Sequence, residues 1–275
     1  MSGLNRKQAK LLKKQVGKLY GRNYIPLMTG DSTLSIGDIL LSKHDILPIL
    51  DSSVFDPVNT EIVEGKKTSK NVTSDSGVKL TAKFRGEAIL SEYFKLDEAG
   101  IVVQFSSDDQ MFLKIQGMRQ QSIKNFISFR QELLERYVNG QISSKVYVVR
   151  GLVYADKYYL QFSGSQGGTV GFQIDADVKY LDAEVEADFN IKWKKEVGYH
   201  IDGSTGGVLA YCVSGVRLKK QLMPAGIQEK IRNGMSESDA LECLSVSERQ
   251  DLLSKDALEI VDLTDEILLA PEKTE

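Results

Sequence analysis

Two stretches of this chain alternate apolar and polar residues with a strict period of two over an unusual length. In residues 78–88 the even positions are apolar or small and the odd positions are polar or charged, and residues 181–193 show the same alternation with apolar odd positions. A period of two is typical of a β-strand with one buried face. Strands in globular proteins are mostly about 5–6 residues long, whereas the second stretch would span roughly 43 Å at about 3.3 Å per residue. The alternation predicts a sheet with long amphipathic strands.

The rest of the chain supplies partners for these strands. Residues 101–115 continue the alternation as a partner segment of the first stretch, and residues 170–178 alternate before the phase changes near residue 180. Helical spacing of apolar residues predicts a helix over residues 120–138, and apolar runs predict buried strands at residues 146–149 and 207–218. The fold class predicted is α+β: a twisted, largely antiparallel sheet with amphipathic hairpins packed by helices, plus a short helical C-terminal tail.

The N-terminal part of the chain is strongly basic. Residues 1–30 carry seven Lys and Arg residues and no acidic residue, and residues 4–20 have the apolar spacing of an amphipathic helix. This pattern fits a solvated surface helix, and it also fits attachment to anionic lipid or to nucleic acid. The candidate lipid-binding residues of this helix are Lys7, Lys10, Lys13, Lys14 and Lys18.

The C-terminal part is acidic and has a different pattern. From residue 224 onward five basic residues face thirteen acidic ones, a net charge of 5 − 13 = −8. Ser236 with Asp239 and Ser245 with Glu248 have the spacing of capping boxes, which predicts two or three short helices. A connector with Pro224, Gly226 and Gly234 precedes them. The chain is therefore divided into residues 1–220 and a tail of residues 221–275.

The motifs of common enzyme sites are missing from the sequence. The two histidines and the widely spaced Cys212 and Cys243 disfavour zinc and Ser/His/Asp chemistry. Ser163 occupies the first glycine position of a nucleophile-elbow pattern, and no phosphate-binding glycine loop is present. We expect no enzyme, no cofactor and no metal site. No apolar run reaches about 18 residues, so we expect no transmembrane helix.

Two structural interpretations fit long amphipathic strands. One is a large twisted sheet with its apolar face covered by the protein's own helices. The other is membrane insertion, because a transmembrane strand needs about 9–11 alternating residues and strands of several subunits can satisfy one another's backbone groups in lipid. The candidate membrane-inserting residues are Val78, Leu80, Ala82, Phe84, Val170, Phe172, Ile174, Val185, Phe189, Ile191 and Trp193.

Over roughly residues 5–220 the chain resembles the pore-forming domain of the gasdermin family. The resembling segments occur in the same order along the chain, and the first of them is the basic N-terminal helix. The further segments are residues 24–27 (Tyr-Ile-Pro-Leu), 34–40 (Leu-Ser-Ile-Gly-Asp-Ile-Leu), 77–80 (Gly-Val-Lys-Leu), 145–149 (Lys-Val-Tyr-Val-Val), 167–171 (Gly-Gly-Thr-Val-Gly) and 207–213 (Gly-Val-Leu-Ala-Tyr-Cys-Val). Because the chain has only a short C-terminal tail, its domain organisation is similar to that of the short bacterial or fungal members of the family rather than to that of animal gasdermins.

The resemblance implies a latent cytoplasmic protein that acts at membranes. A protease would cut the connector within residues 221–240, and the released domain would bind an acidic phospholipid membrane and form a homo-oligomer. Two hairpins per subunit, at about residues 78–116 and 158–200, would insert into a pore that causes cell death in defence or immunity. The apolar residues of the autoinhibitory tail would be Leu252, Leu253, Leu263, Ile267 and Leu268.

Two other functions fit parts of the sequence. The chain could be a non-lytic interaction or scaffold protein whose basic helix binds an anionic partner. A nucleic-acid binder would also use that helix, but the acidic strand faces and the lack of interleaved aromatic and basic residues argue against it. No nucleic-acid partner is expected.

Overall fold

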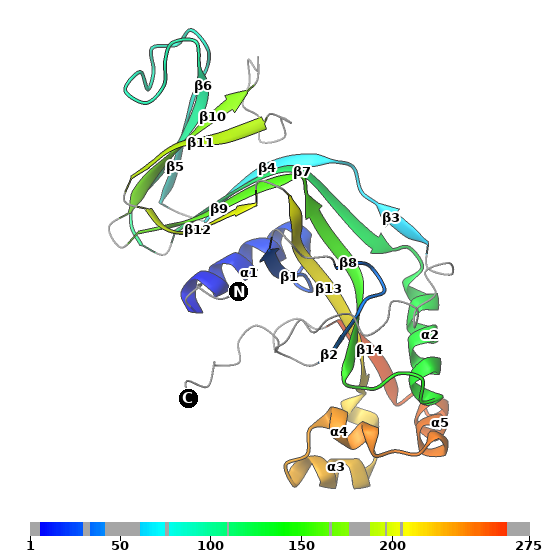
Figure 1. The fold of residues 1–275 in the computed structure, drawn as a ribbon. Coiled ribbons are helices and arrows are strands. Elements are labelled where there is room, and N and C mark those ends of the chain that lie inside the picture. The colour runs from blue at the N-terminus through cyan, green and yellow to red at the C-terminus, as the bar shows by residue number, and fades with distance from the viewer. Residues whose placement is uncertain are drawn as a thin grey trace. The chain divides into compact units, whose positions relative to one another are not determined.

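The computed structural model describes residues 6–29, 34–41, 61–74, 77–108, 110–164, 167–175, 188–195, 197–203 and 206–262. Over these residues the chain is an α+β protein of antiparallel sheets and helices, as the sequence predicts (Figure 1). It divides into two compact units. Unit 1 contains residues 1–33, 65–120 and 153–210, and unit 2 contains residues 34–64, 121–152 and 211–275. The boundary predicted at residue 220 falls inside unit 2, and the release of residues 221–275 stays a prediction.

Unit 1 holds the basic helix and most of the strands. Its elements are α1 (Arg6–Tyr20), β1 (Ile25–Thr29), β4 (Thr68–Thr73), β5 (Val78–Lys83), β6 (Ala99–Phe105), β9 (Lys157–Ser163), β10 (Gly168–Asp175), β11 (Asp188–Lys195) and β12 (Val197–Gly203). The predicted basic helix is confirmed as α1. Leu12 and Val16, one turn apart, are fully buried where α1 packs on β1, so an apolar stripe of two turns fixes this helix.

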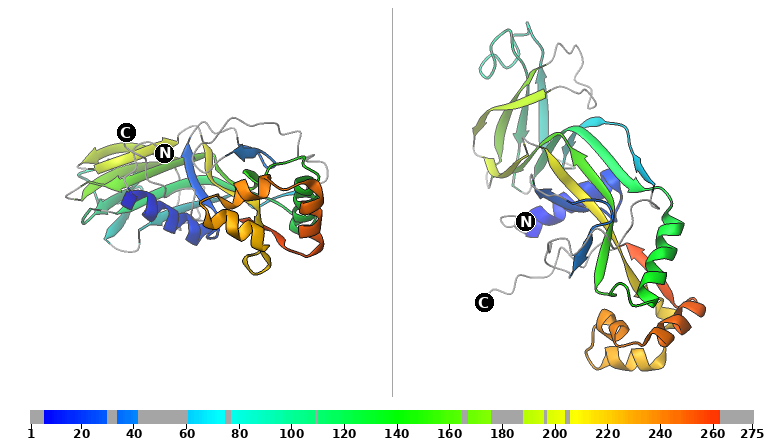
Figure 2. Two further views of the ribbon diagram at one scale, coloured as in Figure 1. Left: turned by 90° about the horizontal axis from the view of Figure 1, so that it is seen from below. Right: turned by 45° about the vertical axis from the view of Figure 1, so that its right-hand side comes forward.

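Unit 2 holds the remaining helices and three short strands. Its elements are β2 (Ile39–Leu41), β3 (Ile62–Glu64), α2 (Phe126–Val138), the 3-10 helix η3 (Lys220–Leu222), α3 (Ala225–Arg232), α4 (Glu237–Glu242), α5 (Val246–Ser254) and β14 (Leu258–Asp262). Figure 2 shows α2 grouped with the C-terminal helices of this unit.

Three long strands contribute residues to both units: β7 (Met111–Ile123), β8 (Val146–Ala155) and β13 (Gly207–Leu218). They belong to the larger sheet, of order β1-β13-β8-β7-β9-β12, in which β14 also pairs with β13, β2 with β8, and β3 and β4 with β7. The predicted strand over residues 207–218 is confirmed. β13 is buried along almost its whole length, and burial of both faces explains its continuous apolar run.

The structure corrects three predictions from the sequence. The helix predicted over residues 120–138 begins only at Phe126, because β7 continues to Ile123 and the Asn125 side chain accepts a hydrogen bond from Ser128 N (3.1 Å). The strand predicted over residues 78–88 ends at Lys83. The partner segment 101–115 is also split, since residues 111–115 belong to β7 in the larger sheet.

The C-terminal helices begin where the sequence places their caps. The Ser245 side chain accepts from Glu248 N (3.3 Å) in a complete capping box, and the Ser236 side chain accepts from Asp239 N (3.1 Å). The strand β14 after them is not predicted from the sequence. It pairs with β13 from Ser214 opposite Asp262 to Leu218 opposite Leu258.

Candidate functional site

Two hairpin ribbons of unit 1 contain most of the residues predicted to insert into a membrane. One ribbon runs along β4 and β5 and returns along β6 and β7; the other runs along β9 and β10 and returns along β11 and β12. The inner part of each ribbon lies in the larger sheet. The outer parts form a separate four-stranded antiparallel sheet of order β11-β10-β6-β5 (Figure 1). The two predicted hairpins are thus neighbours, joined through β6 and β10.

A buried polar residue, Gln110, lies where the first ribbon passes from one sheet to the other. Its side-chain oxygen accepts from Ser106 N (2.9 Å), and its backbone N donates to Ser163 Oγ of the second ribbon (3.0 Å). Ser163 N donates in turn to the Gln110 carbonyl (3.0 Å). Gly77 has φ +81°, and a Cβ atom there would lie 1.6 Å from Gln110 Nε2, so glycine is required at this position. One polar corner therefore holds the bend.

The apolar face of the four-stranded sheet is packed against β7 and β9. Phe172 lies at its centre, with ring centroids 5.4 Å from Phe112, 5.2 Å from Tyr159 and 5.9 Å from Phe189. These distances are in the range of favourable aromatic pairs. All four side chains are fully buried or nearly so, and the face predicted to meet lipid is a protein core in this structure.

The predicted membrane-inserting residues fall mostly on this face. The register of the sheet aligns Leu80 with Val103 and Val170, and Ala82 with Ile101 and Phe172. Leu80, on the edge strand, is 41% exposed. Of the others, Val170, Phe172, Ile174 and Phe189 are buried, Val78, Ala82, Phe84 and Ile191 are half-buried, and Val185 lies outside the described residues.

The alternation predicted over residues 181–193 is interrupted near the end of β11. A register irregularity between Gly171 and Phe172 places Trp193 opposite Gly171 and Lys194 opposite Val170. Lys194 Nζ lies 5.1 Å from the centroid of the Tyr159 ring. A β-bulge shifts every later residue to the other face of a strand, so the backbone position of Trp193 is not in the row of Phe189 and Ile191.

Two lysines of the larger sheet lie against Phe189. Lys114 Nζ is 5.1 Å and Lys157 Nζ is 4.8 Å from its ring centroid, and Lys157 also donates to the Phe189 carbonyl (2.5 Å). Burial lowers the pKa of Lys114 to about 8 because desolvation disfavours the charged ammonium. The docking of β11 on β7 and β9 therefore includes cation–π contacts as well as apolar packing.

The basic residues of α1 lie on the side opposite its buried stripe. Lys7, Lys10, Lys14 and Lys18 are exposed, and Lys13 is half-buried, where desolvation lowers the pKa of its ammonium. Four of the five candidate lipid-binding lysines therefore share an exposed surface of one helix.

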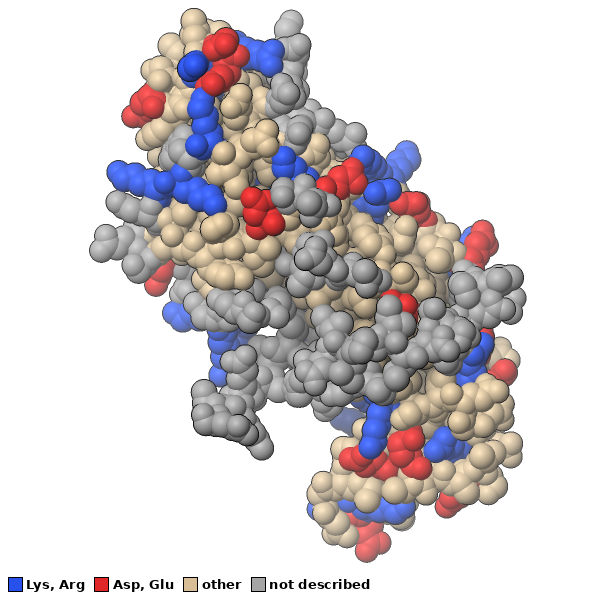
Figure 3. All heavy atoms as spheres, in the orientation of Figure 1, with Lys and Arg blue, Asp and Glu red and all other residues tan. Residues whose placement is uncertain are grey.

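The tail residues divide into a packed part and a part outside the described residues. Leu252 is buried and Leu253 half-buried in the core of unit 2, whereas Leu263, Ile267 and Leu268 lie outside the described residues. Arg249 donates to the Tyr137 carbonyl (3.0 Å), and the Tyr137 hydroxyl donates to the Leu241 carbonyl (3.1 Å). Figure 3 shows basic and acidic side chains interspersed over the region of α3–α5 on the face in view.

Sites for other chemistry are sparse in the part of the chain that the structure describes. There, no group of three or more His, Cys, Asp or Glu side chains is placed to hold a metal ion. Cys212 is buried, and Cys243 is exposed. No helix among the described residues is both long and apolar enough to cross a membrane.

The buried charged residues that sequence reasoning missed include Lys83 of β5 and Arg249 of α5. Lys83 is a polar position in an alternating strand, and nothing in that pattern shows that its ammonium is enclosed. Arg249 lies in an acidic, exposed-looking helix yet is buried against Tyr137. A charge flanked by apolar residues is the only local signal. Lys83 has it, between Ala82 and Phe84, but so does every polar position of an alternating strand, and Arg249 does not have it.

Comparisons with known proteins add little. No family model matches the chain, and no curated protein matches its sequence. Among solved structures, the chain is similar to the cryo-EM structure of the gasdermin A3 membrane pore, with 13% sequence identity and with coverage of 77% of this chain and 90% of that chain. The TM-score is 0.29, which is too low to establish a common fold.

Proposed function

We propose that this chain is a latent pore-forming protein of the gasdermin type and has no enzymatic activity or cofactor. Loss of its C-terminal restraint would let residues 1–220 bind acidic phospholipid, assemble with further copies and insert both hairpins into a membrane, killing the cell. The observation that carries the proposal is the four-stranded sheet, in which two amphipathic hairpins lie side by side with one continuous apolar face.

The energetics of insertion are compatible with this core. Separating the apolar face from Phe112 and Tyr159 in water would expose several buried side chains, each at about 1.5–3 kcal/mol. Moving the same face into lipid avoids most of that cost, because lipid chains are about as apolar as a protein interior. The hairpins are therefore expected to leave the core at a membrane surface, and not in bulk water.

The basic face of α1 supplies a reason for the protein to reach such a surface. Each Lys or Arg near an anionic membrane contributes about 1 kcal/mol of attraction, and Lys7, Lys10, Lys14 and Lys18 are exposed together. This attraction is screened by salt over about 8–10 Å, so vesicle binding should weaken as ionic strength rises.

The packing of the C-terminal segment decides what a proteolytic cut would separate from the rest of the chain. Helices α3–α5 and β14 contribute to the core of unit 2. A cut within residues 221–240 therefore breaks the chain but leaves β14 paired with β13. A cut after Asp262 leaves all these contacts in place and separates only residues 263–275. The two cuts distinguish a restraint in α3–α5 from one in the last residues.

Dye release from vesicles tests the proposal. A recognition sequence for a site-specific protease is inserted after Met223 or after Asp262 in the full chain, and cardiolipin-containing and neutral vesicles are compared before and after cutting. We expect release only from acidic vesicles and only after one of the cuts. Lys10→Glu with Lys14→Glu should abolish it, whereas Lys220→Glu, an exposed lysine of η3, should not.

The opposite result has a definite meaning. If neither cut protein releases dye while both remain folded by circular dichroism, the pore-forming function is wrong. A non-lytic scaffold that binds an anionic partner through α1 would then be the function that fits the same surfaces, and vesicle binding without leakage would distinguish it.

A further inference from the structure

The connection between β5 and β6, residues 84–98, is folded into a compact cap. The sequence keeps its alternation to Ala88, yet the strand ends at Lys83 and the chain turns back on itself. Gly86 N donates to the Leu96 carbonyl (2.7 Å), and Phe94 N donates to the Leu90 carbonyl (3.0 Å). The cap thus holds part of a strand-forming sequence in a conformation that is not a strand.

The Lys83 ammonium lies inside this cap and binds both of its ends. Lys83 is 0% exposed. Its Nζ donates to the carbonyls of Glu98 (2.5 Å), Lys95 (2.8 Å), Leu96 (3.3 Å) and Phe84 (3.4 Å). One cation therefore joins the first residue of the cap to three of its last four, and a buried ammonium is tolerated only when it is hydrogen-bonded in this way.

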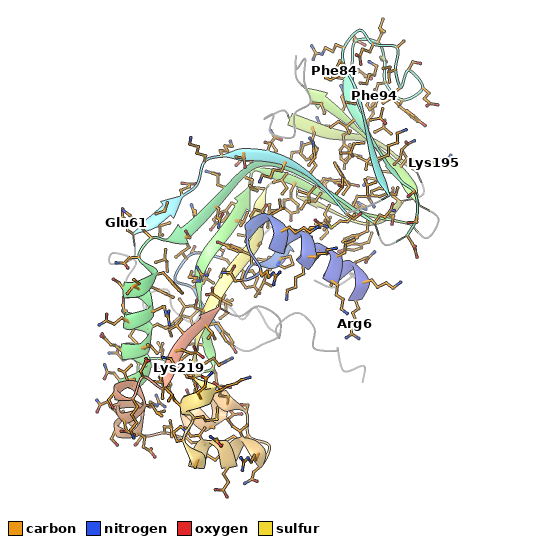
Figure 4. The ribbon with its side chains drawn as sticks, turned by 180° about the vertical axis from the view of Figure 1, so that it is seen from behind. Arg6, Glu61, Phe84, Phe94, Lys195 and Lys219 are labelled. Carbon is orange, nitrogen blue, oxygen red and sulfur yellow. The ribbon has the colours of Figure 1, made fainter. Side chains whose placement is uncertain are left out.

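Two further contacts fasten the cap to the strands. Phe94 is buried on Gly100 of β6, where a Cβ atom would lie 2.4 Å from the ring. The Glu98 carboxylate accepts a hydrogen bond from Lys192 of β11, whose Nζ also lies 5.5 Å from the Phe94 ring centroid. Figure 4 shows Phe84 and Phe94 together at the end of the four-stranded sheet.

We propose that Lys83 is a latch that keeps the cap folded and so keeps the β5–β6 hairpin too short to cross a membrane. The consequence for insertion rests on the function proposed above, whereas the latch itself does not. β5 has six residues, and a transmembrane strand needs about 9–11. β4, on the other side of the polar corner, reads Thr-Ser-Lys-Asn-Val-Thr and offers no apolar face.

The additional length must therefore come from the cap. Residues 78–88 form an alternating segment of eleven residues, and the register that pairs Lys83 with Gly100 would next bring Arg85 opposite Glu98, a favourable cross-strand pair. In that longer hairpin the Glu98 and Lys95 carbonyls are no longer gathered around Lys83. The chain can therefore form either the hydrogen bonds of Lys83 in the folded cap or the longer hairpin, but not both at once.

The latch is tested on the intact full-length protein by amide exchange. Lys83→Met keeps a side chain of similar length and removes the cation. The control is Lys79→Met, which changes an exposed lysine on the same face of the same strand. We expect residues 84–98 to exchange roughly tenfold to hundredfold faster in Lys83→Met and at the wild-type rate in Lys79→Met. Unchanged protection in a folded Lys83→Met protein would overturn the proposal.

A second measurement needs no variant and so covers the case in which Lys83→Met does not fold. An amine-reactive reagent should modify Lys83 of the wild-type protein at least about tenfold more slowly than Lys79, because the buried ammonium reacts only when the cap opens. Equal rates at the two lysines would refute the latch.

Dye release by the cut protein separates the latch from the proposed function. Lys83→Met should release dye from cardiolipin-containing vesicles faster than wild type, and Lys79→Met should match wild type. Faster exchange of the cap with no release from any form would support the latch and reject the pore. Release with unchanged exchange in Lys83→Met would support the pore and reject the latch.

Discussion

The ion pair between Arg150 and Asp262 tests how firmly the C-terminal strand belongs to unit 2. Arg150 Nε donates to Asp262 Oδ1 (2.6 Å), its Nη2 donates to Oδ2, and Ser214 Oγ also donates to Oδ1 (2.8 Å). The two charged side chains are 16% and 23% exposed. The pair therefore lies between an exposed pair, worth about 0–1 kcal/mol, and a buried pair, whose rupture costs about 3–5 kcal/mol. We expect Asp262→Asn to lower the free energy of unfolding by about 2 kcal/mol.

Urea unfolding at pH 7, with amide exchange of β14 measured in parallel, gives both the size and the place of this loss. Asp251→Asn is the matched control, because its pair with Lys255 has side chains 56% and 66% exposed and should contribute less than about 0.5 kcal/mol. In an Arg150→Met background the cost of Asp262→Asn should shrink. If Asp262→Asn costs no more than Asp251→Asn and β14 stays protected, the assignment of β14 to the core of unit 2 is wrong.

Three further predictions concern single residues. Phe172→Ala should cost about 3–5 kcal/mol in urea unfolding, because it empties the centre of an aromatic core; a cost under about 1 kcal/mol would contradict that packing. Asn125→Ala should cost about 1 kcal/mol and speed amide exchange in the first turn of α2, and unchanged exchange there would rule out the cap. Because burial lowers the pKa of Lys114 to about 8 from 10.5, the unfolded chain binds more protons than the folded chain between these values, and stability should rise with pH across that window. Lys114→Met should remove that part of the rise, and an identical pH profile in the variant would refute it.

Much of the local structure could be read from the sequence because it depends on residues a few positions apart. The spacing of Leu12 and Val16 sets the buried stripe of α1, and Ser236 and Ser245 set the starts of α4 and α5. The period of two likewise indicates which residues of β10 face the core. The lipid-facing candidates Val170, Phe172 and Ile174 lie on one face for this reason.

Contacts between distant residues decided the rest, and no local pattern encodes them. β5 ends at Lys83 because carbonyls as far as fifteen residues further along the chain enclose its ammonium. β14 forms where residues 258–262 pair with β13 and Asp262 meets Arg150, 112 residues earlier in the chain. A bulge opposite β10 moves the backbone of Trp193 out of the row of Phe189 and Ile191. The periodicity of apolar residues and the capping residues thus determine which segments become strands and helices. Strand pairing and the burial of charged side chains in the tertiary structure determine where those elements end and which residues they contact.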